Sequence, residues 1–436
     1  MINILIPEDI PSANKGEAAL FFGIAKSLTI FKDSRIHLFS MNPEEDGRAY
    51  GGHAEIVDAR GLVPAHLLDG NGSFLHKLIN YFKFIGKCAS FGLMYRLAGP
   101  WCRSCVKHAA WRRGMAADIV LMCHDSFYAP LYHGPMMMLF KMLKKPVMLY
   151  GSSIMPPDLS GSWVETRARD AFNRFILNKA DWITLRERHS YHYVRFLGVT
   201  RADVYPDLAF IVDTASDAEI DSIFEEEGIP EHAPLCGFAF SQKELDFAHP
   251  NLPLPQRKET AIEAIVAMMN HLTGVLGIHA VFIPHAIGPT ARVDDRIAAD
   301  WIRDRCANND MIHIIRNDYG QRQLKGMASR LDLTVGTRLH FTIDAVCHHV
   351  PSMLITHRGE FRCHGIIGEM LGQARFVYNI ETLSPDDLIE LVTALWENRF
   401  EVREDLSRRL PAIVDSTAGH AARVRRILKQ HSEGAA

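Results

Sequence analysis

Short apolar segments alternate with helical patterns along most of the chain, and this alternation constrains the fold more than any other feature. Six segments lie in the first half, at residues 1–7, 35–41, 117–123, 145–151, 180–186 and 202–210. Five more follow, at residues 235–241, 279–285, 311–316, 331–336 and 351–357. Strands separated by helices form parallel sheets. The sequence therefore predicts an α/β fold of two Rossmann-like domains, with parallel sheets facing each other across a cleft.

The domain boundary is expected in a polar, acidic segment, DTASDAEIDSIFEEEGIPEHAP, between the two series. A chain of 436 residues is also too long for one ordinary core. We predict an N-terminal domain at residues 1–213 and a C-terminal domain at residues 214–400. Helices at residues 401–436 are expected to cross back to the first domain.

The composition is that of a globular protein without a nucleic-acid partner. Hydrophobic residues make up 47% of the chain and charged residues 23%, with a formal net charge of −3. The start reads as a first strand and not as a signal peptide, and no apolar run is long enough to cross a membrane. The cysteines are scattered, so we expect reduced thiols and a cytoplasmic protein.

One segment, residues 70–117, differs from the rest in its charge. It contains no acidic residue, and its lysines and arginines are interleaved with aromatic and aliphatic side chains. One interpretation is a solvated helical cover over the first sheet. The other is peripheral contact with an anionic membrane, at the inner face of the bilayer.

Arg338 and His340 follow the buried segment at residues 331–336, and the tight turn at Gly336 precedes them. If the chain is still extended there, the two side chains lie on the same side. Arginine offers a planar fork for phosphate or carboxylate, and histidine is an acid or base near neutral pH. The alternative is that Arg338 pairs with Asp332 or Asp344 and that His340 packs in the interior.

Other predicted strands also end on polar groups. His285 ends one strand, Arg186 ends another, and Asp207 follows Pro206 near the domain boundary. Asn14 and Gly16 open a helix after the first strand, and a helix N-terminus attracts anions. Each has a plainer explanation: a packed histidine, an arginine paired with Glu187, a turn aspartate, and ordinary helix capping.

Several motifs are absent from the sequence. It has no glycine-rich phosphate loop of either common kind, no HExxH and no DxD. We therefore expect no nucleotide cofactor. The sequence holds 22 histidines, so chance clustering explains the histidines near residues 348–364 better than a metal site does.

These elements, in this order, resemble the polysaccharide pyruvyl transferase family. The resemblance rests on NKGEAALFFGIAKSL, ADWITLRERHSYHYVRFLGV, the strand ending IPH with DD after it, and YGQRQLKGMASRLDLTVGTRLHFTIDAVCHHVPSMLI. The family is similar to glycosyltransferases of the two-domain GT-B architecture. Its members move the enolpyruvyl group of phosphoenolpyruvate onto two hydroxyls of one sugar and form a pyruvate ketal.

The resemblance implies roles for individual residues. Arg338 and His340 match the donor-site arginine and histidine of the family, and Arg186 matches the arginine of another element. We expect Arg338 and Arg186 to hold the anion and His340 to be the general acid, with His285 as a second base or acceptor contact. Asn14, Gly16 and Asp207 are the remaining candidates for substrate binding. The acceptor is expected to be a cell-surface polysaccharide or its lipid-linked precursor.

The chain departs from the family pattern on the presumed acceptor side. It has HDSFYAP in place of a glycine-rich turn, GSSIMPP in place of GQGIGP, and Arg358 and Arg362 where a lysine is common. Two other functions therefore stay open. One is a nucleotide-sugar glycosyltransferase of the same architecture, and the other is a non-catalytic family member in envelope polysaccharide assembly.

Overall fold

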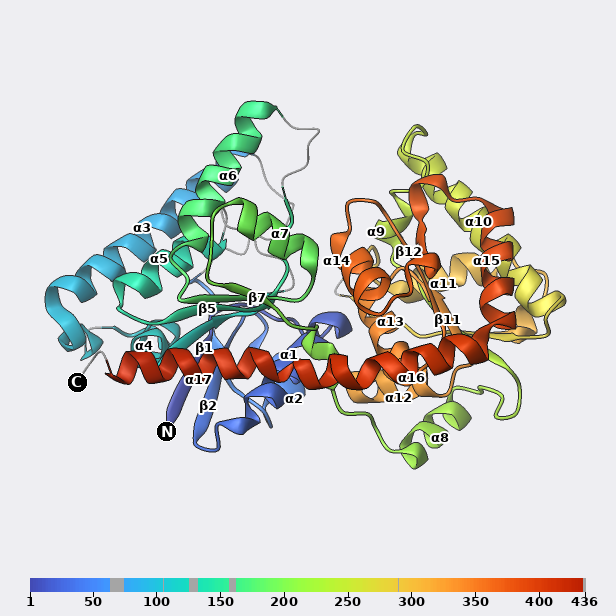
Figure 1. Ribbon diagram of the computed structural model, residues 1–436, viewed down its shortest axis with the longest axis horizontal. Coiled ribbons are helices and arrows are strands. Elements are labelled where there is room, and N and C mark those ends of the chain that lie inside the picture. The colour runs from blue at the N-terminus through green and yellow to red at the C-terminus, as the bar shows by residue number, and fades with distance from the viewer. Residues whose placement is uncertain (63–73, 105, 125–131, 157–161, 289, 434–436) are drawn as a thin grey trace. The chain divides into compact units, whose positions relative to one another are not determined.

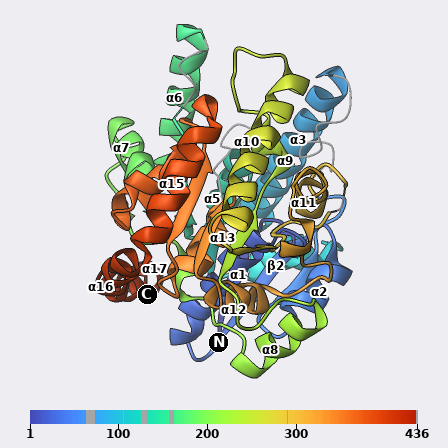
Figure 2. The same cartoon turned by 90° about the vertical axis from the view of Figure 1, so that its right-hand side faces the viewer.

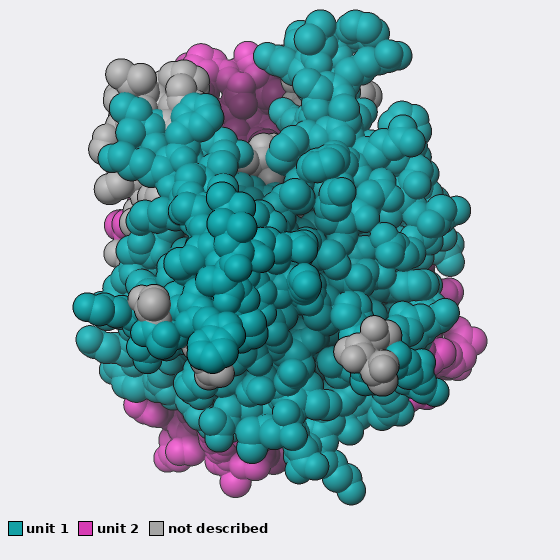
Figure 3. Space-filling view, turned by 90° about the vertical axis from the view of Figure 1, so that its left-hand side faces the viewer, with its two compact units in different colours: residues 1–12, 24–207, 416–436 teal, residues 13–23, 208–415 magenta. Residues whose placement is uncertain are grey.

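The computed structural model describes the chain except for residues 63–73, 105, 125–131, 157–161, 289 and 434–436. The chain divides into two compact units (Figure 1; Figure 3). Unit 1 comprises residues 1–12, 24–207 and 416–436, and unit 2 comprises residues 13–23 and 208–415. The division near residue 207 lies close to the predicted boundary. The start of the first long helix, in contrast, groups with the second half of the chain.

Unit 1 is built on a parallel sheet of seven strands in the order β3-β2-β1-β4-β5-β6-β7. The strands are β1 (Ile2–Ile6), β2 (Ser34–Ser40), β3 (Glu55–Asp58), β4 (Ile119–Met122), β5 (Val147–Ser152), β6 (Trp182–Leu185) and β7 (Ala202–Val204). The central strands are buried along their whole length, as expected for a sheet covered on both faces. The sequence predicted six of these strands and missed β3.

Eight helices accompany this sheet. They are α1 (Lys15–Ser27), whose first part belongs to unit 2, α2 (Pro43–Tyr50), α3 (Phe74–Ala98), α4 (Ala109–Ala116), α5 (Gly134–Met142), α6 (Trp163–Leu177), α7 (Arg188–Phe196) and α17 (Ala418–Glu433). α3 packs against α5, and α17 packs against β5 and β6. No helix among the described residues has both the length and the apolar character needed to cross a bilayer.

Unit 2 has a second parallel sheet, of six strands in the order β10-β9-β8-β11-β12-β13. Its strands are β8 (Leu235–Ala239), β9 (His279–Phe282), β10 (Ile312–Ile314), β11 (Leu333–Gly336), β12 (Ser352–Thr356) and β13 (Val377–Asn379). The sequence predicted all but β13. The expected α/β fold with two parallel sheets is therefore confirmed.

Helices cover both faces of the second sheet. They are α8 (Asp217–Glu226), α9 (Gln242–Leu245), α10 (Leu254–Gly274), α11 (Asp295–Arg303), α12 (Gln321–Ser329), α13 (Leu339–Val346), α14 (Phe361–Cys363), α15 (Pro385–Glu397) and α16 (Arg399–Ser416). α10 and α15 lie side by side and share one core cluster (Figure 2). α8 and α12 contribute to a separate cluster.

The C-terminal helix α17 docks on unit 1 through a buried histidine. The ring of His420 is fully buried; its Nε2 donates to the carbonyl oxygen of Pro206 at 3.0 Å, and its Nδ1 lies 2.8 Å from the hydroxyl of Thr184. Burial lowers the pKa of His420 to about 4, although the Pro206 carbonyl and nearby aspartates oppose the shift. The docked helix therefore requires a neutral imidazole.

This docking predicts a loss of stability in mild acid. Because the pKa of His420 is lower in the folded protein than its ordinary value near 6.5, the unfolded chain binds the proton first. The stabilisation is present above pH ~6.5 and decreases by about 3 kcal/mol as the pH falls to ~4. Chemical denaturation across this range measures the effect. The same series on His420→Gln should have a shallower slope, and equal slopes would contradict the assignment.

Candidate functional site

The carboxyl ends of β8 and β11 meet at the point where the strand order of unit 2 reverses. Open α/β sheets bind ligands at such a point. Ser241 follows β8, Thr337 follows β11, and the backbone N–H of Ser241 donates to the hydroxyl of Thr337 at 2.8 Å. The next residue, Arg338, therefore leaves the sheet at the place where a ligand is expected.

Arg338 is held in position by an aspartate from another element. Its backbone is extended, as predicted, at φ −96° and ψ 110°, and it forms the N-cap of α13. Its Nε donates to Asp295 Oδ2 at 3.1 Å, and its Nη2 pairs with Oδ1 of the same carboxylate. The sequence proposed Asp332 or Asp344 as the alternative partner, and the structure shows Asp295 instead.

Asp295 itself is fixed by the backbone. The N–H groups of His285 and Ala286 both donate to its Oδ2 at 3.0 Å. The Arg338 side chain is 23% exposed, and its Nη1 makes no hydrogen bond within the described part of the chain. A guanidinium oriented in this way keeps a donor for an external anion. Burial raises the pKa of the neighbouring Glu244, although the charge of Arg338 opposes the shift.

His340 is helical and not extended, which corrects the prediction for this residue. α13 begins at Leu339, so His340 is the second residue of the helix. The expectation that it shares one side of a strand with Arg338 is therefore wrong, because the extended backbone ends at Arg338. The ring nevertheless packs beside α1, where a Cβ added to Gly16 would lie 2.6 Å from His340 Nδ1.

The start of α1 is attached to unit 2, which brings Asn14 and Gly16 to the same region. Asn14 forms a bridge with Ala286, and the N–H of Lys15 donates to the carbonyl oxygen of His285 at 3.0 Å. The side-chain oxygen of Asn14 accepts from the N–H of Gly16 at 3.2 Å. Asn14 thus makes an ordinary helix-start hydrogen bond, and Gly16 makes room for the imidazole of His340.

His285, whose backbone carbonyl accepts from Lys15, is only 1% exposed. Its Nδ1 donates to the carbonyl oxygen of Ile283 at 3.1 Å, and its Nε2 lies 3.4 Å from Asp344 Oδ2. Asp344 also accepts from Gln321 at 2.7 Å. This geometry favours the packed histidine over the catalytic one, and a catalytic role for His285 stays a prediction.

Arg362 brings a second cation towards α1. Its Nε donates to Glu360 at 2.6 Å, its side chain is 20% exposed, and it interacts electrostatically with Glu17 of α1. Burial lowers its pKa from the ordinary value. Arg358, the other arginine of this segment, is 74% exposed and pairs with Glu381. Of the two, Arg362 is the better candidate to replace the lysine that is common in the family.

Arg186 and Asp207 form a fully buried ion pair in unit 1. Both side chains are 0% exposed, and Arg186 Nη1 lies 2.7 Å from Asp207 Oδ2. Arg186 Nε also donates to the hydroxyl of Ser153 at 2.9 Å. The partner of Arg186 is therefore Asp207 and not Glu187, which instead caps α7. This arrangement favours a structural role, and anion binding by Arg186 stays a prediction.

A polar group that the sequence did not predict lies at the corresponding reversal point of unit 1, between β1 and β4. Glu8 follows β1, and its Oε2 accepts from the N–H groups of Cys123 and His124 after β4. Its Oε1 lies 2.7 Å from His133 Nε2, and both side chains are almost fully buried. Burial alone would raise the pKa of Glu8, but His133 holds it below the ordinary value.

Asp9 extends this group towards the surface. Its Oδ1 accepts from the N–H of Met41, after β2, at 2.8 Å. Burial raises the pKa of Asp9 to about 6, and Asp46 adds to the shift. The signal in the sequence was the ProGluAsp segment directly after the first strand. Among the described residues, no three His, Cys, Asp or Glu side chains gather as metal ligands.

Comparison with known proteins identifies a family whose model matches the chain and a relative from Erwinia amylovora. A model of the family "Polysaccharide pyruvyl transferase" matches residues 14–359. The amylovoran biosynthesis protein AmsJ of Erwinia amylovora is 24% identical over 300 residues, which cover 67% of this chain and 68% of that protein.

Solved structures share the fold at low identity. UDP-GlcNAc 2-epimerase from Neisseria meningitidis, bound to UDP-GlcNAc, has a TM-score of 0.59 at 12% identity and covers 98% of this chain and 99% of its own. A glycosyltransferase from Rickettsia africae has a TM-score of 0.58 at 10% identity with the same coverage. These similarities support the GT-B-like architecture and nothing more. Because the family model matches well over half of the sequence, the chain belongs to the polysaccharide pyruvyl transferase family, a family of transferases that act on polysaccharides.

Proposed function

We propose that this protein transfers the enolpyruvyl group of phosphoenolpyruvate to two hydroxyls of one sugar and forms a pyruvate ketal. The acceptor is a sugar of a cell-surface polysaccharide or of its lipid-linked precursor. The observation that carries the proposal is Arg338: a partly exposed guanidinium, oriented by Asp295, at the reversal point of the unit 2 sheet. Phosphoenolpyruvate presents a phosphate and a carboxylate close together, which suits such a fork.

The reaction assigns a proton transfer to His340. A proton delivered to the methylene carbon makes the central carbon electrophilic. One sugar hydroxyl attacks that carbon, the carbon–oxygen bond to phosphate breaks, and the second hydroxyl closes the ring. The two hydroxyls lose two protons in total; one balances the proton gained by the methyl group, and the other leaves with phosphate. His340, in the first turn of α13 directly after Arg338, is the proposed acid.

Unit 1 offers a group suited to the acceptor hydroxyls. Glu8 and His133 form a buried pair at the other reversal point, and burial raises the pKa of Asp9, which follows Glu8 in the chain, to about 6. A carboxylate that titrates near neutral pH is an effective general base. Asp9 is therefore a candidate contact for an acceptor hydroxyl bound to unit 1, with Glu8 and His133 maintaining the shape of this polar group. The altered HDSFYAP segment begins at His124, whose N–H donates to Glu8, and its other residues lie outside the described part of the chain.

Calorimetric titration with phosphoenolpyruvate tests the donor assignment. The wild-type protein should bind it saturably, and Arg338→Ala should weaken binding by about 100-fold, because two charge-assisted hydrogen bonds are lost. Arg338→Lys should recover only part of the affinity, since an ammonium lacks the planar fork. Arg330→Ala, which removes an arginine paired with Asp217 and Asp221 elsewhere in unit 2, is the matched control.

The competing functions predict different results. Binding of UDP or GDP without binding of phosphoenolpyruvate would replace the proposal with a nucleotide-sugar glycosyltransferase. Binding of phosphoenolpyruvate without phosphate release, over a panel of saccharide acceptors, would favour a non-catalytic role. Release of inorganic phosphate together with a new ketal methyl signal in the NMR spectrum of the saccharide would support ketal formation.

A further inference from the structure

Helix α3 carries an apolar stripe on its exposed face, in addition to the apolar face that it buries. Phe84, Cys88 and Phe91 are buried in the core of unit 1. On another side of the same helix, Ile79 is 44% exposed, Phe82 62%, Leu93 54% and Leu97 81%. Figure 1 shows α3 along the outside of unit 1. A helix that only covered a sheet would be polar on its outer face.

The spacing of the exposed residues makes this stripe continuous. Positions 79, 82, 86, 90, 93 and 97 follow one another at intervals of three or four residues, which places them on one face of a helix. Gly86 and Ser90, the two small residues of this set, are also exposed. The four apolar members of the stripe belong neither to the core cluster of unit 1 nor to the partly buried residues packed against it.

Basic side chains flank the stripe, and acidic ones are absent from the segment. Lys83 and Lys87 lie on one flank by their helical positions, and Arg96 lies on the other; all three are exposed. No aspartate or glutamate occurs between residues 70 and 117. A peptide or protein partner for an apolar stripe does not require this one-sided charge, whereas an anionic bilayer surface does.

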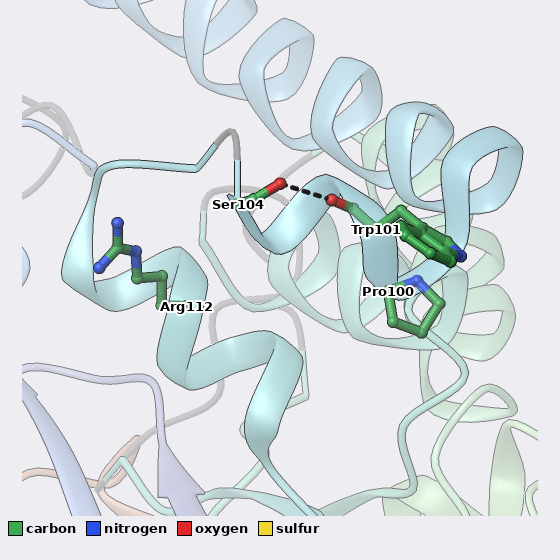
Figure 4. A pocket seen from close by; sticks show the side chains of 4 residues that line it. All are labelled: Pro100, Trp101, Ser104 and Arg112. Carbon is green, nitrogen blue, oxygen red and sulfur yellow. Dashed lines mark hydrogen bonds between the residues drawn. The ribbon is translucent and has the colours of Figure 1, made fainter.

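An open pocket of about 600 Å³ lies directly after α3 (Figure 4). It is lined by Pro100, Trp101, Ser104 and Arg112, and Trp101 is 87% exposed. Arg112 donates through Nε to the carbonyl oxygen of Val106 at 2.6 Å, and its terminal nitrogens make no hydrogen bond to any described residue. An exposed tryptophan and an arginine with spare donors, which lie apart around the pocket (Figure 4), suit the headgroup region of a bilayer, where indole rings and phosphates meet.

We propose that the exposed stripe of α3 and the Trp101–Arg112 pocket form a docking surface for an anionic phospholipid bilayer. The apolar side chains enter the interface between headgroups and acyl chains, and the flanking lysines and arginines contact lipid phosphates. α3 lies in the interface plane and does not cross the membrane. This inference is independent of pyruvyl transfer, since no residue of the docking surface belongs to the Arg338 group or to the Glu8 group.

Vesicle flotation of the full chain tests the surface. The wild-type protein should float with vesicles that contain phosphatidylglycerol, bind poorly to pure phosphatidylcholine, and dissociate at high salt. Lys83→Gln/Arg96→Gln should weaken binding about 30-fold, at roughly fivefold for each basic residue. Phe82→Ser/Leu97→Ser should weaken it at least tenfold, because two apolar side chains no longer enter the interface.

Matched variants act as controls. Val275→Ser removes an apolar side chain that is 70% exposed in unit 2, and Lys32→Gln removes an exposed lysine outside the segment; both should bind vesicles like the wild type. Unchanged thermal unfolding and unchanged phosphoenolpyruvate titration show that the double variants are folded. Failure of the wild-type protein to bind anionic vesicles would overturn the proposal, as would binding by both double variants that equals that of the wild type. A dimer in sedimentation that Phe82→Ser/Leu97→Ser dissociates, without vesicle binding, would assign the stripe to a second copy of the chain instead.

Discussion

Replacing His340 with alanine should lower kcat by roughly 100- to 10,000-fold while leaving the affinity for phosphoenolpyruvate within a few-fold of the wild type. The reason is that the imidazole is assigned to proton delivery, whereas Arg338 supplies the binding charge. Phosphate release in single turnovers measures the chemical step, and titration measures binding. Equal losses in both quantities would make His340 a binding residue and would leave the acid unassigned.

Gly16 provides a test of the same assignment that keeps the histidine. A methyl group at this position would lie 2.6 Å from His340 Nδ1, so Gly16→Ala must displace the ring. We expect a slower chemical step with little change in phosphoenolpyruvate binding. Gly47→Ala is the matched control, because Gly47 is also a helical glycine and a Cβ there meets nothing within 4 Å. Normal turnover by Gly16→Ala would show that the position of the ring is unimportant.

Replacing Asp207 with asparagine should destabilise the protein by about 3–5 kcal/mol, because it removes the carboxylate that lies 2.7 Å from the fully buried guanidinium of Arg186. Chemical denaturation measures this loss. The matched control is Asp217→Asn, which breaks an ion pair whose aspartate is 90% exposed and should change stability by less than about 1 kcal/mol. A small effect of Asp207→Asn would mean that water reaches the pair.

The double variant Arg186→Met/Asp207→Leu separates the two roles of Arg186. Apolar replacement of a buried pair is often neutral for stability, so this variant should recover much of the loss. If the recovered protein binds phosphoenolpyruvate normally, Arg186 is structural. If it is stable and no longer binds, Arg186 is the second cation that the family resemblance implies.

The sequence predicted the strands well because buried parallel strands are short, continuous apolar runs. It missed β3 and β13 because these strands include polar, partly exposed positions. It located Arg338 correctly at a strand end but not its partner, since Asp295 comes from another element. It placed His340 in the wrong backbone conformation because the start of a helix directly after a turn has no strong local signal.

Long-range packing explains the other misses. Nothing in the segment around Asn14 indicates that it pairs with Ala286, so its membership in unit 2 emerges only in three dimensions. Likewise, the burial of Arg186 depends on Asp207, which belongs to a later strand end. The sequence did not predict a role for Glu8, because a glutamate after a strand usually lies at the surface. The backbone N–H groups that donate to it, those of Cys123 and His124, come from a distant part of the chain.

The docking of α17 has a consequence for synthesis on the ribosome. Unit 1 contains the first residues of the chain and also residues 416–436, so its sheet is translated long before the helix that completes it. Thr184 and the Pro206 carbonyl, which His420 contacts, stay without this partner until the ribosome has translated residue 420. Nascent chains normally fold domain by domain from the N-terminus. Here the first unit is completed by a helix from much later in the chain, and truncation before Ala418 would disable the part of the protein that is made earliest.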